Sequence, residues 1–231
     1  GRIEDVHWIV TFSSEQPFIY HQTTHGRAFV FGRSDWQYVF NTFSYAYAIG
    51  YHFLERPEGA TNGNFVGIGA DSCTNHSVLV EQSQPFGILI TNGEFTAWCD
   101  RAANSKNLWH QHGSVVLFCP PGDPTVAPVH VQVMNGNFGA LKFVDCEFQG
   151  QPTSIAIIGA GTESAADNKY NLANGTVSFI GCHFADWDDW LNATQIASRT
   201  PCVKPSGCWV QRGSPAFDQR SGQFLLSGNE F

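Results

Sequence analysis

Residues 140–148 read ALKFVDCEF, and three further segments align with this nonapeptide without gaps: GILITNGEF at 87–95, TVSFIGCHF at 176–184 and QFLLSGNEF at 223–231. In each segment the second and fourth residues are apolar, which is the period-two alternation of a strand with one buried face. A small or turn-forming residue then stands two positions before a Phe that ends all four segments. Each segment therefore predicts a strand, a tight bend and the start of a second strand.

Columns of like residues run through the four aligned segments. The first apolar column holds Ile88, Leu141, Val177 and Phe224, and the bend column holds Gly93, Cys146, Cys182 and Asn229. Asn and Gly tolerate left-handed dihedral angles, so the bend column is expected to turn the corner in that conformation.

A lone strand of this kind cannot hide its apolar face, whereas coils stacked at about 4.8 Å place like residues above like. Two looser matches, at 78–86 and 131–138, come just before two of the segments, as successive faces of one coil would. The sequence therefore predicts an all-β fold, a right-handed parallel β-helix or solenoid. The alternative is an antiparallel sandwich, which also uses short strands and turns.

The spacing of the segments predicts how the chain is organised. Their terminal Phe residues lie 53, 36 and 47 positions apart, so a short coil would carry excursions of variable length. We expect a single β-helix domain over 1–231, a fragment of a longer chain or a processed product. Its excursions are expected at about 99–128, 160–174 and 185–216, where they either wall a groove or merely cover the side of the helix.

Charge and hydropathy restrict the partners. The formal net charge is −8, from 12 Lys and Arg against 20 Asp and Glu. This balance argues against nucleic acid, because phosphate neutralisation needs clustered Lys and Arg. It favours a neutral glycan over a polyuronate, although a local basic groove can overrule the net charge. No apolar run approaches the roughly 20 residues that span a bilayer, so no membrane partner is expected.

Seven Cys and three N-glycosylation sequons, at Asn75, Asn174 and Asn192, favour a secreted, extracellular protein. No CxxC occurs, no Cys/His spacing resembles a zinc site, and His110 and His112 lack a third ligand, so no metal site is expected. The disulfide candidates are Cys202 with Cys208, Cys146 with Cys182, and Cys99 with Cys119. The first pair brackets a turn-rich loop and the third could close the long excursion. For the second pair, stacked free thiols are an equal alternative.

Two alternating apolar residues, a corner Gly or Asn and then Phe form a pattern that resembles the rungs of the pectate-lyase-like β-helix superfamily. The resemblance covers about residues 64–231, and the stretch 29–54 also looks like a coil of such proteins. It implies a protein that acts on polysaccharides, as the lyases and glycoside hydrolases of that superfamily do. The polygalacturonase set of Asn-x-Asp, Asp-Asp, Gly-His-Gly and Arg-x-Lys is not present, so no catalytic residue carries over.

Carbohydrate chemistry uses two carboxylates flanking the scissile bond, with aromatic rings against the sugar faces. The segment that follows Phe184 offers both, with Asp186, Asp188 and Asp189 as catalytic candidates and Trp187 and Trp190 as substrate-binding candidates. The alternative is a polar loop whose Trp residues pack back onto the helix.

A second candidate is Arg33-Ser34-Asp35-Trp36 with Tyr38. Arg33 and Asp35 could hold a pair of sugar hydroxyls, with Trp36 or Tyr38 as a platform. A structural Arg–Asp pair at a coil corner is the interpretation we favour. The residues that precede each terminal Phe are Glu94, Glu147, His183 and Glu230, and we expect them to form a solvated outer face rather than a cation-binding or acid–base ladder.

These features predict an extracellular carbohydrate-active β-helix, most simply a polysaccharide-degrading glycoside hydrolase or lyase-like domain whose partner is a glycan. A lyase would also use a bound Ca²⁺ near the substrate carboxylate, and otherwise no cofactor is expected. The alternative is a non-catalytic, glycosylated structural or adhesive module of a fibre or appendage, with self-assembly or a larger parent chain. Two carboxylates lining a groove beside Trp or Tyr would favour the enzyme.

Overall fold

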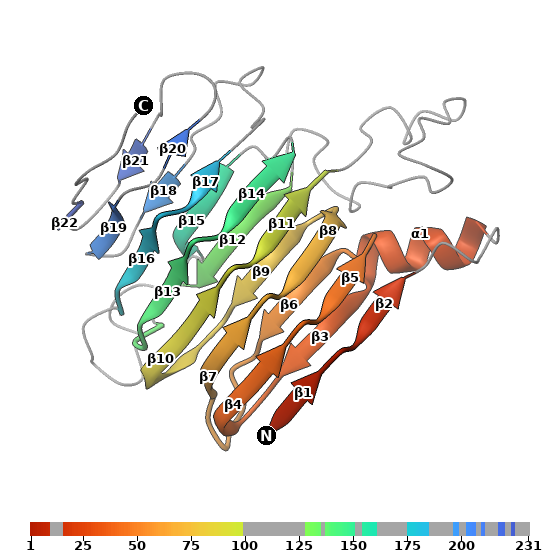
Figure 1. Ribbon diagram of the computed structural model, residues 1–231, viewed down its shortest axis with the longest axis horizontal. Coiled ribbons are helices and arrows are strands. Elements are labelled where there is room, and N and C mark those ends of the chain that lie inside the picture. The colour runs from red at the N-terminus through yellow and green to blue at the C-terminus, as the bar shows by residue number, and fades with distance from the viewer. Residues whose placement is uncertain are drawn as a thin grey trace.

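The computed structural model describes residues 1–9, 16–98, 128–134, 137–150, 154–160 and 175–184, and the backbone of five short strands from residue 196 onward. The chain is a parallel β-helix, in which three parallel sheets run side by side along the stack of coils (Figure 1). Each strand pairs with its counterpart one coil away, so the antiparallel sandwich is wrong. Successive strands visit the three sheets in turn, and one circuit makes one coil.

Sheet A contains β1 (Arg2–Glu4), β4 (Ser34–Phe40), β7 (Thr61–Val66), β10 (Ser83–Thr91), β13 (Leu141–Val144), β16 (Val177–Ile180), β19 (Cys202–Ser206) and β22 (Gln223–Phe224). Sheet B contains β2 (His7–Ile9), β5 (Phe43–Tyr45), β8 (Gly69–Cys73), β11 (Glu94–Ala97), β14 (Glu147–Gly150), β17 (His183–Phe184) and β20 (Trp209–Val210). Sheet C contains β3 (Arg27–Phe31), β6 (Ile49–Phe53), β9 (His76–Val80), β12 (Val129–Met134), β15 (Ser154–Ala160), β18 (Ile196–Ser198) and β21 (Phe217–Gln219).

The predicted apolar columns are confirmed for the repeats at 87–95, 140–148 and 176–184. Ile90 is in register with Phe143, and Phe143 with Phe179, and the column continues on the other side of Ile90 through Phe65 to Val39. All five side chains are fully buried. Like residues stack because each coil buries its apolar face only against the coils beside it, so the core runs the length of the described stack.

The corner between sheets A and B differs from the prediction by one residue. The left-handed residue of each coil is Asp5, Asn41, Gly67, Asn92, Asp145 or Gly181, with φ between 47° and 64°. It stands one position before the expected column. Cys146 and Cys182 follow it and are buried, so that column is small because its side chains fill the tight inner corner.

Replacing Asn92, whose φ is 52°, by Val is expected to lower the free energy of unfolding by about 2 kcal/mol. A β-branched side chain clashes with its own backbone in the left-handed region, whereas Gly at the same position relieves the strain and should be close to neutral. Urea denaturation of the two variants checks this. Equal stability of Asn92→Val and Asn92→Gly would show that the corner does not depend on left-handed geometry.

The stretch 185–216, expected as one excursion, holds most of a coil, because β18, β19 and β20 lie within it. Val177 is in register with Val203, and Val203 with Phe224, so the 47 residues between Val177 and Phe224 contain two coils of 26 and 21 residues. Phe224 therefore belongs to the predicted column, but two coils away from Val177. The stretch 99–127 and the stretch 161–174 lie outside the described residues.

The helix α1 (Gln16–His25) lies between β2 and β3 in the first coil and was not predicted. The buried apolar side chain of the helix is Ile19, which packs with Ala46 and so anchors the helix to the coil behind it. Thr23 donates its hydroxyl to the Ile19 carbonyl at 2.9 Å, and the amide of Gly26 donates to the Gln22 carbonyl at 2.9 Å, which ends the helix. Tertiary contacts thus hold a segment of weak helix propensity.

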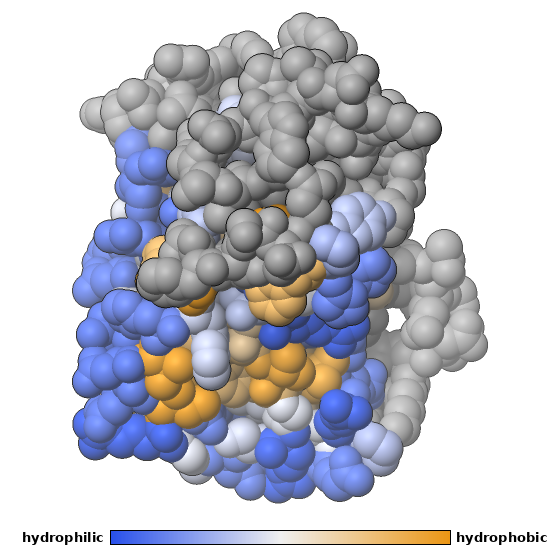
Figure 2. Space-filling view, turned by 90° about the vertical axis from the view of Figure 1, so that its right-hand side faces the viewer, coloured by the Kyte–Doolittle hydropathy of each residue, from blue (hydrophilic) through white to orange (hydrophobic). Residues whose placement is uncertain are grey.

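The first coil forms one end of the described stack, because β1, β2 and β3 each stand last in their sheet. Three apolar side chains of the strands of this coil are strongly exposed, Trp8, Ile9 and Val30, and so are Phe18 and Tyr20 of α1. Figure 2 views the molecule from this side and shows apolar surface bordered by polar surface. This end therefore carries apolar side chains outside the core.

Candidate functional site

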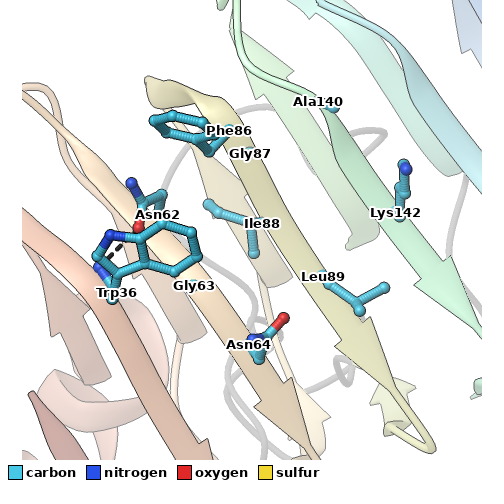
Figure 3. Close-up of a pocket in the computed structure, with 10 residues that line it drawn as sticks. All are labelled: Trp36, Asn62, Gly63, Asn64, Phe86, Gly87, Ile88, Leu89, Ala140 and Lys142. Atoms are coloured by element: carbon cyan, nitrogen blue, oxygen red, sulfur yellow. Dashed lines mark hydrogen bonds between the residues drawn. The ribbon is translucent and has the colours of Figure 1, made fainter.

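A pocket of about 210 Å³ opens on the outer face of sheet A, over the first residues of β7 and β13 and the middle of β10 (Figure 3). The side chains around it are Trp36, Asn62, Asn64, Phe86, Leu89 and Lys142. We call it the aromatic pocket. It contains one residue of the second sequence candidate, Trp36.

Irregular pairing in three neighbouring coils builds the aromatic pocket. Ser34, Thr61 and Ser83 are in register, and so are Gln37, Gly63 and Ile88, which lie three, two and five positions further along their strands. Between these two levels β4 has two residues, β7 has one and β10 has four. The surplus residues of β4 and β10 have no partner in the ladder, so they bulge outward on either side of β7.

Asn62 holds the two bulges together. The backbone amide of Trp36 donates to Asn62 Oδ1 at 2.6 Å, and Asn62 Nδ2 donates to Gln84 Oε1 at 2.6 Å. Gln84 Nε2 in turn donates to the Ala60 carbonyl at 2.8 Å. Trp36 has a φ of 52°, which a bulky residue rarely adopts and which persists only where surrounding contacts enforce it. The Asn62 amide is that contact.

The bulges present two aromatic rings to solvent. Trp36 is 56% exposed and Phe86 is 77% exposed, and their ring centroids are 5.6 Å apart at an interplanar angle of 33°. Phe86 ends the looser match at 78–86, but unlike Phe95, which is buried, it lies on the outer surface. Together the two rings form a contiguous exposed apolar patch, a feature that marks a binding site more often than single exposed rings do.

Two glycines allow the coils to approach under the pocket. A Cβ atom on Gly63 would lie 2.0 Å from the Gln37 carbonyl oxygen, and one on Gly87 would lie 2.1 Å from the Ala140 carbonyl oxygen. Both also have positive φ, 151° and 80°. Any side chain at either position would push the bulged strand away from its neighbour.

Arg33 and Asp35 form an ion pair with each other. Arg33 Nη2 lies 2.9 Å from Asp35 Oδ2, and Arg33 Nη1 donates to the Glu58 carbonyl at 2.8 Å. Gln84 Nε2 donates to Asp35 Oδ1 at 2.6 Å. The hydrogen bonds from Arg33 and then Gln84 hold the pKa of Asp35 below its usual range, so this carboxylate is ionised and is no general acid at neutral pH. The pair supports the Trp36 bulge.

Tyr38 is also outside the pocket lining. It is 39% exposed and its ring lies parallel to that of Phe40, with centroids 6.3 Å apart. Tyr38 is in register with Asn64, and Asn64 with Leu89. It therefore extends the outer face of sheet A beside the pocket, one coil from Asn64.

The first sequence candidate, Asp186, Trp187, Asp188, Asp189 and Trp190, lies outside the described residues. The strand before it, β17, belongs to sheet B, whereas the aromatic pocket lies on sheet A. In the outer column of sheet B, Glu94, Glu147 and His183 are in register as predicted. The next residue of that column is Trp209, and Glu230 is outside the described residues. Glu147 Oε1 lies 2.5 Å from His183 Nδ1, and both side chains are about 30% exposed, as on a solvated face.

Cys73, Cys146 and Cys182 are buried thiols. Cys146 and Cys182 are thiols stacked in neighbouring coils and do not form the candidate disulfide. A hydrogen bond with Cys182 lowers the pKa of Cys146. Burial raises the pKa of Cys73 to about 12, which makes it inert as a nucleophile. Cys99, Cys119 and Cys208 lie outside the described residues. Cys202 begins β19, so the expected turn-rich loop after it is largely strand.

Only one sequon lies within the described residues. Asn75 is half-buried at the corner between sheets B and C. Its backbone N–H donates to the Ala48 carbonyl, and its backbone carbonyl accepts from the backbone N–H of Val129. Ser77 of the same sequon is fully buried. Asn174 and Asn192 lie outside the described ranges, so glycosylation stays a prediction.

The pocket suits binding better than bond cleavage. Among the described residues, its lining contains one charged side chain, Lys142, and no carboxylate. Within the described part of the chain, no three His, Cys, Asp or Glu side chains gather as a metal site would require. The described helix is also too short and too polar to cross a membrane.

No protein-family model, curated protein or solved structure matches the chain. The geometry of the aromatic pocket is therefore the basis for any functional conclusion. Sequence reasoning found Trp36 but missed Asn62, Phe86 and Lys142. The sequence pattern that could have revealed Lys142 is its place at a strand position whose side chain points outward. Asn64 and Leu89 occupy the same kind of position in the neighbouring coils, and the register of the strands brings the three residues together on one surface.

Proposed function

We propose that this β-helix binds a glycan at the aromatic pocket, with Trp36 and Phe86 as the platform for the sugar rings. The observation that carries the proposal is the exposed pair of rings held in place by the buried Asn62 amide. The C–H faces of a pyranose pack against aromatic rings, and nearby amide and ammonium groups bind its hydroxyls. Asn64 and Lys142 stand beside the rings to supply those groups.

Other ligands fit the site less well. Nucleic acid would need clustered cations, and the lining has Lys142 alone in a chain of net charge −8. A protein interface would need a larger continuous apolar area than two rings and Leu89 provide. A sugar chain needs only a small, rigid platform with polar groups at its rim.

A glycan panel followed by calorimetry tests the proposal. Trp36→Asn removes the ring and keeps a residue that tolerates left-handed geometry, and it should weaken binding by about tenfold or more. Phe86→Ala should weaken it similarly. Trp8→Ala removes a comparably exposed Trp from sheet B and should leave affinity unchanged. Absence of binding to any glycan, or equal loss in Trp8→Ala, would overturn the proposal.

The finer proposal is that the protein is extracellular, belongs with the pectate-lyase-like β-helices and degrades the polysaccharide it binds. Supporting this are the resemblance of the coils and the cluster Asp186, Asp188 and Asp189. Glycoside hydrolysis requires two carboxylates roughly 5–10 Å apart, and the described residues of the pocket lining supply none. A hydrolysis assay on the triple Asp→Ala variant at these positions decides it. Turnover at the unchanged rate in the triple variant would exclude these three Asp residues as the catalytic groups. Glycan binding without turnover in the unsubstituted protein would favour the adhesive module.

A further inference from the structure

The exposed side of α1 carries two histidines one helical turn apart. His21 and His25 are both exposed, and their imidazole rings stack with centroids 5.2 Å apart and planes 9° apart. Residues at i and i+4 of a helix project from the same face, which is the spacing that lets two imidazoles bind one metal ion. The pair is independent of the aromatic pocket, which lies on sheet A.

A hydrogen-bond chain sets the tautomer of His25. Thr24 Oγ1 lies 2.5 Å from the Tyr20 carbonyl oxygen and 2.6 Å from His25 Nδ1. A hydroxyl has one proton, and the carbonyl can only accept, so Thr24 donates to Tyr20 and accepts from the N–H at His25 Nδ1. The neutral ring then has its lone pair at Nε2. A fixed tautomer with the outer nitrogen unprotonated is the state of a ligating histidine.

The ring of His21 is available, since no described residue is hydrogen-bonded to it. The helix beneath the pair is anchored to the coil behind it. Gln22 Nε2 donates to the Ala46 carbonyl at 3.3 Å, and the backbone carbonyl of Gln22 accepts from the Ala48 N–H at 3.1 Å. The hydroxyl of Thr74 donates to the Thr23 carbonyl. Because these contacts fix the backbone between the histidines, binding a metal would order only two side chains.

We propose that His21 and His25 form a surface site for a divalent transition-metal ion, with Cu²⁺ bound most tightly. Two neutral imidazole nitrogens supply adjacent coordination positions, and water or an external ligand completes the shell. Imidazole sites bind Cu²⁺ more tightly than Ni²⁺ or Zn²⁺, and the tetragonal preference of Cu²⁺ tolerates two cis nitrogens. Hard ions such as Ca²⁺ prefer oxygen and should not bind there.

Titration of the whole chain with Cu²⁺ alone, by calorimetry and electron paramagnetic resonance, tests the site. We expect a site with two nitrogen ligands that His21→Gln and His25→Gln each weaken at least tenfold. The matched control is His110→Gln/His112→Gln, which removes the other closely spaced pair and should retain the site. Circular dichroism checks that each variant is folded. Retention of the site in both single variants, or its loss in the control instead, would overturn the proposal.

Discussion

Replacing Phe148 by Ala is expected to lower the free energy of unfolding by about 3–5 kcal/mol. The side chain is 1% exposed and lies at the centre of a cluster of rings. The neighbouring ring centroids are those of Phe95 and Phe184 at 5.2 Å, His130 at 5.4 Å, Phe143 at 5.7 Å and Phe179 at 5.9 Å. Coils on both sides hold these rings, so the cavity cannot close by moving one strand.

The control for this variant is Phe86→Ala. Phe86 is also a strand Phe, but it is 77% exposed, so its removal should change stability by less than about 0.5 kcal/mol. Urea denaturation of both variants measures the difference. A loss below about 1 kcal/mol for Phe148→Ala would mean that the coils do not stack their Phe residues into a common core.

Acid is expected to destabilise the fold well before most carboxylates titrate. Burial lowers the pKa of His130 to about 3, and burial, with a smaller contribution from His52, lowers the pKa of His76 to about 4. An unfolded histidine titrates near 6.5, so below that pH the unfolded chain binds protons that the folded chain does not. Stability from each group is complete above pH 6.5 and is lost as the pH falls toward the folded value. Each should account for about 3 kcal/mol between pH 6.5 and 4.

Denaturation curves at pH 7 and pH 4.5 for His130→Gln check this expectation. The variant is expected to be less stable at pH 7, because the ring packs on Phe148 and Nδ1 lies 3.2 Å from Ser77 Oγ, but to lose distinctly less stability on acidification. Val131→Ala is the matched control, since it removes a neighbouring buried side chain that does not titrate. It should lower stability equally at both pH values. An unchanged pH dependence in His130→Gln would contradict the assignment.

The repeat could be predicted because a solenoid places like residues above like. Ile90, Phe143 and Phe179 are in register, because a column of similar apolar side chains fills a continuous core at low cost in free energy. The corner was misplaced by one residue because Asp145 and Cys146 both suit a bend by composition. Only the backbone shows that Asp145 is left-handed and that Cys146 turns inward.

Two features could not be predicted from local pattern. The coil that contains Val203 has little of the motif, because Pro205 stands where the neighbouring coil has Phe179, and it becomes visible only through its pairing with Val177. The helix α1 contains Ile and two Thr, which favour strands, and packing on Ala46 outweighs that propensity. Without the helix, the four-residue spacing of His21 and His25 had no meaning.

Only part of the candidate site could be predicted from the sequence. Trp36 and its supporting Arg33–Asp35 pair were found from residue types alone. Phe86 and Asn62 were not, because their proximity to Trp36 depends on unequal numbers of residues, two, one and four, between paired positions of three coils. Such a register shift follows from backbone pairing and has no signature in any single strand.

A crystal structure of the protein with an oligosaccharide from the glycan panel tests the central claim most directly. The account predicts parallel coils with Ile90 between Phe65 and Phe143, and a sugar ring packed against Trp36 and Phe86. Antiparallel neighbouring strands, or a sugar bound elsewhere with the two rings uncovered, would contradict it.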